Sequence, residues 1–282
     1  MNICIIGDGL TSLALAKNLI NKKINVHFYH KKKIESLPSS RTIGISKNNL
    51  EFFRKTIHKI PKNFFWEIKK IEIYSEKLKK ENLLKFENDN KNLFYMIKND
   101  ALYKLLINKI SKNKFFKKSI IKKEHYYKDL LKNNKYDLII NCDSNNFISK
   151  KYFVKKIIKN YNNLAYTTII KHKKIKNNTA IQIFTKRGPI AFLPISNNET
   201  SVVCSLDTKN KEYEDREVLD LINKNNLKYQ IQKNLKFSSF KLSSSNLRNY
   251  YYKNILAFGD LLHRIHPLAG QGFNMTIRDI KI

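Results

Sequence analysis

Gly7, Gly9 and Ser12 have the spacing of a turn that binds the phosphates of a dinucleotide. The apolar run NICII precedes them, and apolar residues at helical spacing follow from Leu10. In such a turn the first glycine permits a tight bend, the second lets the backbone approach a pyrophosphate, and a small third residue lets the helix pack on the strand. The helix N-terminus adds free N–H groups and a positive dipole end. We therefore predict cofactor contacts from Gly7, Gly9, Leu10, Thr11 and Ser12; a glycine turn without a ligand is the alternative.

The second strand, residues 24–30, ends in His30, where an acidic residue usually binds a ribose diol. Imidazole can hydrogen-bond a hydroxyl group, so His30 is a candidate cofactor contact. A solvent-facing histidine after a strand is the alternative. Because Lys31, Lys32 and Lys33 follow, a 2′-phosphate site, and hence an NADP-dependent reductase, is a second alternative.

A second glycine-rich segment follows the strand NILAFGD, residues 254–260. After Gly259-Asp260 the chain carries His263, Pro267, Gly270-Gln271-Gly272 and Asn274. This order resembles the flavin-binding motif of the group A FAD-dependent aromatic monooxygenases, which share the p-hydroxybenzoate hydroxylase fold. The opening IIGDGLTSLALA looks like the start of the ubiquinone-biosynthesis hydroxylases within that class.

The resemblance implies roles for individual residues. Asp260 would hydrogen-bond a ribityl hydroxyl, and the backbone at Gly270–Gly272 would approach the isoalloxazine because glycine lacks a side chain. Arg41, in the segment SSRTIGIS, would lie near the flavin and the pyrophosphate, while DLIINCDSNN keeps the Asp143 of an internal motif but has Ser144 where glycine is usual. His263 is a candidate catalytic base, with a structural role as its alternative. The remaining cofactor contacts implied by the resemblance are Gly259, Pro267, Gln271, Gly272, Phe273 and Asn274.

The resemblance also implies an activity. FAD would be reduced by NAD(P)H and would react with O₂ to a flavin C4a-hydroperoxide, which transfers one hydroxyl group to an aromatic ring. The expected substrate is a polyprenylated phenol of ubiquinone biosynthesis. Its ring would lie near Phe184, Ile190, Phe192, Leu193 and Pro194, for which the plain core of an antiparallel sheet is the alternative. A catalytically impaired FAD-binding protein is the other alternative, because the chain stops at Ile282, soon after the Gly loop, and so is expected to be truncated.

The composition is strongly basic, with a formal net charge of +32. Most of that charge is lysine rather than arginine, whereas proteins that bind phosphate groups favour the bidentate arginine side chain. We therefore expect that lysine accumulated by mutational drift at tolerant surface positions, and we expect no nucleic-acid partner. The charge would favour contact with an anionic membrane. The sequence shows no metal-ligand spacing, no signal peptide and no apolar stretch long enough to cross a bilayer. We therefore expect a cytoplasmic protein, peripheral on the inner membrane if it contacts one.

The pattern of elements predicts an α/β fold with an inserted sheet. Short buried strands alternate with helices near both ends, whereas period-2 strands dominate after residue 161. We therefore predict a discontinuous, Rossmann-like FAD-binding domain with a parallel sheet, interrupted by an antiparallel β-sheet substrate domain. The FAD-binding domain comprises residues 1–63, 97–160 and 246–282, and the substrate domain comprises residues 64–96 and 161–245.

Overall fold

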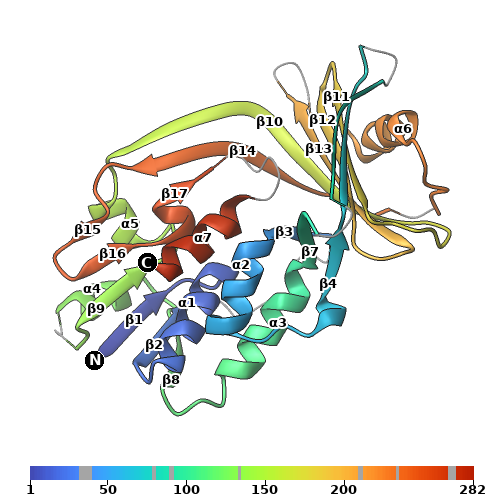
Figure 1. The fold of residues 1–282 in the computed structure, drawn as a ribbon. Helices are drawn as coiled ribbons and strands as arrows, with labels where there is room; N and C mark the ends of the chain where they lie inside the picture. The colour runs from blue at the N-terminus through green and yellow to red at the C-terminus, as the bar shows by residue number, and fades with distance from the viewer. Residues whose placement is uncertain are drawn as a thin grey trace.

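The computed structural model describes residues 1–31, 40–77, 81–88, 92–132, 135–208, 212–232, 235–265 and 271–282. The chain forms two lobes, with the first and last segments in one of them (Figure 1). That first lobe is built on a six-stranded sheet in the order β15-β16-β9-β1-β2-β8. Its strands are β1 (Asn2–Ile6), β2 (Asn25–His30), β8 (Phe116–Ile120), β9 (Leu138–Asn141), β15 (Tyr251–Tyr252) and β16 (Ile255–Ala257). All pairings are parallel except that of β15 with β16.

The second lobe is an eight-stranded sheet in the order β17-β14-β10-β13-β12-β11-β5-β6. Neighbouring strands are antiparallel except for β11 with β5. Its strands are β5 (Lys70–Ser75), β6 (Asn82–Glu87), β10 (Lys156–Lys171), β11 (Thr179–Thr185), β12 (Gly188–Pro194), β13 (Glu199–Asp207), β14 (Ser238–Leu247) and β17 (His263–Arg264). Helix α6 (Asp215–Asn225) packs on one face, where its Val218 and Ile222 are fully buried.

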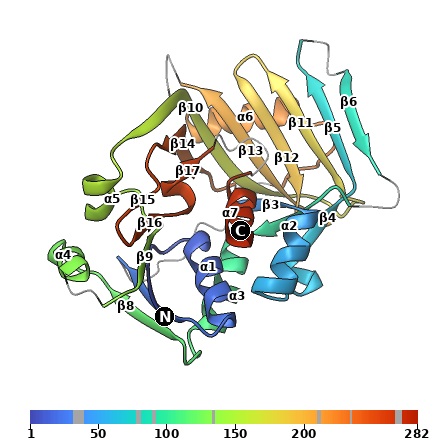
Figure 2. The same cartoon turned by 60° about the vertical axis from the view of Figure 1, so that its left-hand side comes forward.

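A small three-stranded sheet lies between the lobes, with β7 (Phe94–Lys98) between β3 (Thr42–Ser46) and β4 (Phe65–Ile68). The remaining helices belong to the first lobe or to the connections (Figure 2). They are α1 (Leu10–Asn21), α2 (Lys47–Phe52), η1 (Phe53–Ile57), η2 (Lys62–Phe64), α3 (Asn99–Ile110), α4 (His125–Lys132), α5 (Phe147–Tyr152), η3 (Gly259–Leu261) and α7 (Gln271–Lys281). Among the described residues, no helix has the length and apolarity needed to cross a bilayer.

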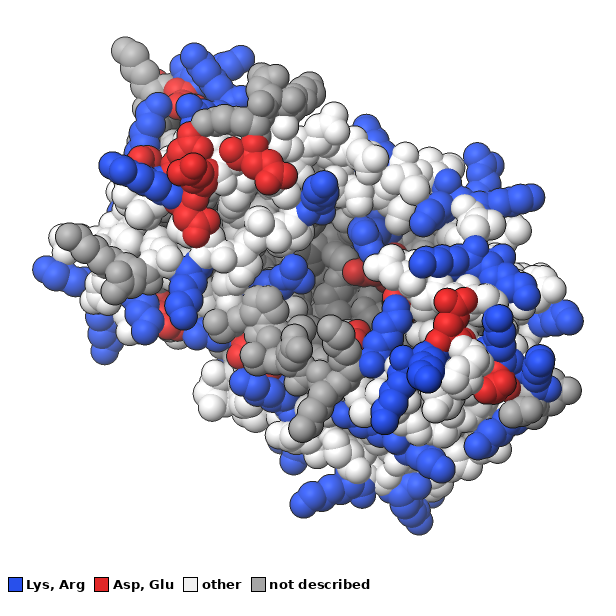
Figure 3. Space-filling view, turned by 180° about the vertical axis from the view of Figure 1, so that it is seen from behind, with Lys and Arg blue, Asp and Glu red and all other residues white. Residues whose placement is uncertain are grey.

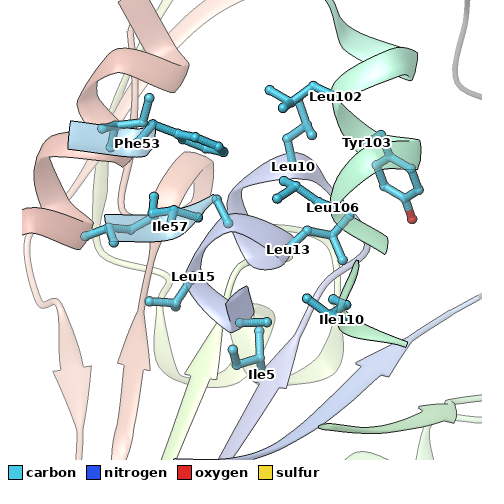
Figure 4. Packing of buried hydrophobic residues seen from close by; sticks show 14 of the residues in the cluster. Ile5, Leu10, Leu13, Leu15, Phe53, Ile57, Leu102, Tyr103, Leu106 and Ile110 are labelled. Atoms are coloured by element: carbon cyan, nitrogen blue, oxygen red, sulfur yellow. The ribbon is translucent and has the colours of Figure 1, made fainter. Parts of the chain in front are cut away.

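The main core lies where α1 packs between α3 and η1 on one face of the parallel sheet. Figure 4 shows Leu13 and Leu106 on the α3 side of α1 and Phe53 on its other side, and each has no exposed surface. Helix α1 is apolar around most of its circumference because the sheet and both neighbouring helices cover it. This packing holds the N-terminus of α1 in a fixed position at the edge of the sheet.

The predicted fold class is confirmed: a parallel α/β sheet is interrupted by a mainly antiparallel one. Helix α2 continues into the wider turns of η1, which end at Ile57. The boundary predicted at residues 160 and 161 falls inside β10, and the division into domains stays a prediction.

Strands β10 and β14 form a long ribbon that joins the lobes (Figure 1). The register shifts between Asn160 and Leu164, where Asn162 has a φ of 53°. Such a bulge bends a strand and increases its local twist. Phe153 and Leu247, at one end of the ribbon, are buried in the first lobe, whereas Leu164 is buried in the second.

A buried polar network lies on the β2 side of the parallel sheet. The two ring nitrogens of His27 contact the hydroxyls of Ser119 at 2.7 Å and Tyr136 at 2.5 Å, and Tyr29 lies 2.9 Å from Tyr136. Burial, with a smaller contribution from the charges of Lys117 and Lys135, lowers the pKa of His27 from 6.5 to about 4. The folded protein therefore keeps His27 neutral where the unfolded chain would protonate it.

We predict that the free energy of unfolding decreases as the pH is lowered, because His27 becomes protonated in the unfolded chain before it does in the folded protein. Because the folded pKa is depressed, its contribution is complete above pH 6.5 and is lost as the pH falls toward 4, with a slope of up to about 1 kcal/mol per pH unit. Urea unfolding at several pH values measures this slope, and His27→Gln should flatten it. Equal slopes in the two proteins would show that His27 is not responsible.

Candidate functional site

Four polar or glycine turns meet at the carboxyl edge of the parallel sheet. Gly7 follows β1, His30 ends β2, Asp143 follows β9 and Gly259 follows β16. These strands are neighbours in the order β16-β9-β1-β2, and ligands of open α/β sheets bind outside the carboxyl ends of their strands. The structure thus brings the two glycine-rich segments, more than 250 residues apart in sequence, to one edge.

The first turn is tight at Gly7. Its φ is +140°, and a Cβ at this position would lie 3.0 Å from the Cβ of Cys142. Ser12 is fully buried, and its hydroxyl donates to the Gly9 carbonyl at 3.0 Å. A serine therefore fits the third position of the turn because its polar group is satisfied within the first turn of α1.

Gly9 differs from Gly7 because the space in front of it is open. A Cβ on Gly9 would meet nothing within 4 Å, and its φ of −89° is accessible to any residue. Gly9 precedes the first turn of α1, whose N–H groups lack partners within the helix. The fold itself therefore does not require glycine here, whereas a pyrophosphate approaching the helix would.

The second glycine-rich segment packs directly on the first. Gly259 has a φ of +63°, and a Cβ there would lie 2.4 Å from Cγ2 of Thr11 in α1. The hydroxyl of Thr11 lies 3.2 Å from that of Thr276 in α7. Asp260, next to Gly259, is exposed at the same edge. Contacts between the two motifs are thus part of the protein core.

Asn274 fastens α7 to β3 and α2. Its Oδ1 accepts from the Ser46 N–H at 3.0 Å and from the Asn49 amide at 2.8 Å, and its Nδ2 donates to the Gly44 carbonyl at 2.7 Å. Phe273, beside it, packs against Phe53 at 6.3 Å between ring centroids. In this structure both residues hold the helix in place, a role that the sequence prediction had not given them.

Asp143 and His30 are the two remaining predicted residues at the carboxyl edge of the parallel sheet. Lys31 forms an ion pair with Asp143 at 2.7 Å, which joins the end of β2 to the turn after β9. His30 is only 3% exposed, so the alternative of a solvent-facing histidine is wrong. It is buried because β2 lies inside the sheet, between β1 and β8.

A cavity of about 700 Å³ lies between the lobes, and the face seen in Figure 3 is hollowed there. Its walls are the face of the eight-stranded sheet that α6 leaves open, the three-stranded sheet, and α7. The apolar part of the lining is Ile71, Phe94, Met96, Ala180, Ile181, Pro189, Ala191, Leu193, Val203, Phe240 and Met275. Small-molecule sites commonly have volumes of about 300–1,000 Å³ and mainly apolar walls with a few polar groups.

Arg41 and Asn99 supply buried polar atoms to this cavity. The Asn99 N–H donates to the Arg41 carbonyl at 3.0 Å, and the Arg41 guanidinium lies over the Phe240 ring at 4.8 Å. Within the described part of the chain, neither the Nε of Arg41 nor the Oδ1 of Asn99 has a hydrogen-bond partner. Because buried polar atoms are rarely left unpaired, this donor and acceptor fit a polar ligand such as the ring system and linker of FAD.

His263 does not line the cavity but lies behind a residue that does. Its Nε2 is 3.0 Å from the carboxylate of Asp279, which lines the cavity from α7. Burial raises the pKa of Asp279, and the nearby His263 opposes that rise. The sequence prediction singled out His263 and missed Asp279 and Asn99, since only the fold shows which side chains reach the cavity.

The predicted substrate residues lie on both faces of the eight-stranded sheet. Phe192 is 1% exposed in the core beneath α6, and Ile190 and Pro194 are buried on the same side of β12. Leu193 lines the cavity, together with Pro189 and Ala191. Phe184 is 45% exposed and pairs with Pro189, so it lies on the cavity face of the sheet. A shift of one residue along a strand exchanges its two faces, and here the bulkier set belongs to the core.

Gln271 and Gly272 begin α7, and Gln271 borders the cavity. A Cβ on Gly272 would meet nothing within 4 Å, so the fold leaves open space there, as it does at Gly9. The predicted contacts Pro267 and Gly270 lie outside the described residues.

Comparison with known proteins gives a family for the second half of the chain. Residues 152–281 match the FAD binding domain family. The mitochondrial ubiquinone biosynthesis monooxygenase COQ6 of Dictyostelium discoideum is 27% identical over 139 residues, which is 36% of this chain and 28% of that protein. The 3-demethoxyubiquinol 3-hydroxylase of Escherichia coli is 33% identical over 109 residues, or 35% of this chain and 27% of that protein. The matched segments thus span less than a third of these relatives.

Solved structures share the fold over almost the whole chain. The p-nitrophenol 4-monooxygenase of Pseudomonas putida superposes with a TM-score of 0.79 at 11% identity, covering 99% of this chain and 77% of that one. The 2-methyl-3-hydroxypyridine-5-carboxylic acid oxygenase has a TM-score of 0.73 at 13% identity, covering 99% and 80%. The predicted resemblance to FAD-dependent aromatic monooxygenases is therefore confirmed for the fold and for the FAD binding domain.

We predict that the contact between the two glycine-rich segments can be tested by steric substitution. Gly259→Ala should lower the free energy of unfolding by about 2–3 kcal/mol, because of the positive φ and the clash with Thr11. Thr11→Ser removes the clashing methyl group and should restore about half of that loss in the double variant. Chemical unfolding of the single and double variants measures the coupling, and simple additivity would contradict this packing.

Proposed function

Starting from an FAD binding domain on the fold of the FAD-dependent aromatic monooxygenases, we propose that this protein hydroxylates an aromatic ring with NAD(P)H and O₂ as co-substrates. The observation that carries the proposal is the cavity, which is bordered by α7 of the second glycine-rich segment and by the open face of the eight-stranded sheet. A ring bound there would lie beside the helix that follows the flavin motif. The names of the curated relatives favour a polyprenylated phenol of ubiquinone biosynthesis as the substrate.

FAD would extend from the carboxyl edge of the parallel sheet into the cavity. The open N-terminus of α1 at Gly9 would receive the pyrophosphate, and Arg41 and Asn99 would bind polar atoms of the ring system or its linker. When bound, FAD supplies hydride acceptance and oxygen activation. The full set of proposed contacts is Gly7, Gly9, Leu10, Thr11, Ser12, His30, Arg41, Asn99, Asp143, Gly259, Asp260, Pro267, Gly270, Gln271, Gly272, Phe273 and Asn274.

The chain's own residues would orient the substrate and exclude water from it. Ala191, Leu193 and Phe94 offer apolar surface to an aromatic ring, while polar groups such as Gln182 stand on the same wall. Asp279, with His263 behind it, is the one carboxylate among the described residues that line the cavity. In this proposal it would accept a hydrogen bond from a phenol hydroxyl and so fix the orientation of the ring.

Two alternative functions can be distinguished from this one by experiment. An NADP-dependent reductase would use the first glycine turn alone, but Lys31 of its expected phosphate site is paired with Asp143. A catalytically impaired FAD-binding protein would bind flavin without turnover. Purification with FAD followed by a visible spectrum, and then NAD(P)H oxidation with an added phenol, distinguishes all three. Colourless protein that binds NADP would sink the monooxygenase proposal.

We predict that Gly9→Asp separates folding from FAD binding. Aspartate is a favourable N-cap and the position is open, so stability should be unchanged or slightly higher. A carboxylate facing the pyrophosphate should weaken FAD binding at least about tenfold. Flavin fluorescence titration measures this, with Asn48→Asp, an equal charge change on exposed α2, as the control. Unchanged FAD affinity in Gly9→Asp would place the pyrophosphate elsewhere.

We predict opposite phenotypes for neighbouring residues of β12. Ala191→Phe fills the cavity, so it should keep FAD and fold but lose at least about tenfold of the phenol-stimulated NAD(P)H oxidation. Phe192→Ala should lower the free energy of unfolding by about 3–5 kcal/mol, because it opens a hole beneath α6. Thermal unfolding and the oxidation assay score both variants. Full activity in Ala191→Phe would remove this wall from the substrate site.

The proposed substrate class has a consequence for location. A polyprenylated phenol resides in a bilayer, so a protein that acts on it would work at a membrane surface. We therefore propose a cytoplasmic protein that is peripheral on the inner membrane. The basic surface favours such contact electrostatically.

A further inference from the structure

Exposed apolar side chains gather at the first-lobe end of the β10–β14 ribbon, where successive residues such as Ile157 and Ile158 point to its two faces. Residues 154–160 and 248–254 are all exposed there. The ribbon-end surface comprises the following apolar and aromatic side chains, with their exposed fractions: Val154 61%, Ile157 58%, Ile158 52%, Tyr250 56%, Tyr251 72% and Tyr252 43%. Single exposed apolar residues are ordinary, but a cluster rimmed by charge marks an interaction site.

The two segments lie side by side. Lys156 pairs with Leu247 in the strand register, and the Arg248 N–H donates to the Lys155 carbonyl at 2.8 Å. The ring of Tyr152, at the end of α5, stacks on that of Tyr252 with centroids 4.4 Å apart. Hairpin strand β15 therefore lies beside the start of β10, at the same end of the ribbon.

The rim of this surface is basic. Lys155, Lys156, Arg248 and Lys253 are exposed on the same segments, and Lys151 is exposed at the end of α5. The ammonium of Lys253 lies 5.9 Å from the Tyr252 ring centroid. Neither residues 144–198 nor residues 221–259 contain a single aspartate or glutamate. The two segments therefore carry positive charge without an acidic side chain of their own, which favours an anionic partner for their apolar side chains.

We propose that the ribbon-end surface docks the protein on an anionic phospholipid bilayer. Valine and isoleucine side chains can enter the acyl boundary, tyrosines prefer the interfacial level, and lysines extend to acidic headgroups. A nucleic-acid-binding surface would instead present several arginines and aromatic rings on which bases stack, whereas this one has one arginine and three exposed aliphatic side chains. The ribbon-end surface assigns residues to the membrane contact proposed above, and it is separate from the cavity, so its docking does not require FAD.

A second apolar strand supplies a matched control. In β6, Leu83, Leu84 and Phe86 are 42%, 54% and 49% exposed. Glu81 and Glu87 flank them, and Lys85 is paired with Glu87. This strand has similar apolar exposure without the excess of positive charge.

The test is co-sedimentation of the whole protein with phosphatidylcholine vesicles, with and without phosphatidylglycerol. We expect binding that requires phosphatidylglycerol and weakens as salt rises. The Ile157→Asp and Tyr251→Asp double variant should lose at least about tenfold in affinity. The double variant Leu84→Asp and Phe86→Asp, with the same charge change, should lose less than about twofold. Unfolding midpoints of both variants confirm that they fold.

Tryptophan fluorescence tests the same surface with a variant that keeps its affinity for the bilayer. Trp66 is the single tryptophan of the chain, so Tyr251→Trp adds a reporter on the ribbon-end surface. Its emission should shift to the blue with anionic vesicles beyond any change in the wild-type protein. Absence of vesicle binding, equal losses in the two double variants, or tight binding of single-stranded RNA that Ile157→Asp leaves unchanged would each overturn the proposal.

Discussion

The packing of α7 onto α1 and β3 is the constraint on which the site depends. The side chain of Asn274 joins α7 to the backbone of β3, and Thr276 meets Thr11 across the helix interface. Gly259 must lack a side chain for the same interface to pack closely. One helix therefore fixes the turn at the sheet edge and forms a wall of the cavity between the lobes. A ligand that spans both places thus contacts two sets of residues whose relative positions are fixed.

Further contacts across the lobes keep the cavity walls in place. Lys98 of β7 forms an ion pair with Glu199 of β13 at 2.8 Å, and the Thr42 hydroxyl donates to that of Ser201 at 2.9 Å. Both contacts join the three-stranded sheet to the open face of the eight-stranded sheet. The cavity is thus bounded by elements that are fastened to each other on either side, which suits a site that must hold a ring and a cofactor at a constant separation.

The sequence was informative where one pattern has one structural outcome. The apolar run before Gly7 and the helical spacing after it predicted β1 and α1, and the alternation after residue 161 predicted the antiparallel strands. It did not predict which face of β12 borders the cavity, because both alternating sets are largely apolar. Only the position of α6 decides that the bulky Ile190 and Phe192 belong to the core. The roles of Asn99 and Asp279 likewise depend on neighbours distant in sequence, which residue spacing does not encode.

The β10–β14 ribbon has a consequence for how the protein folds. Phe153 and Leu247 fasten one end of it into the first core, while Leu164 and Ile170 belong to the second. The bulge near Asn162 lets one strand serve both lobes without a break. Neither core can disassemble without pulling apart hydrogen bonds that also hold the other, so two spatially distinct cores should melt as one cooperative unit.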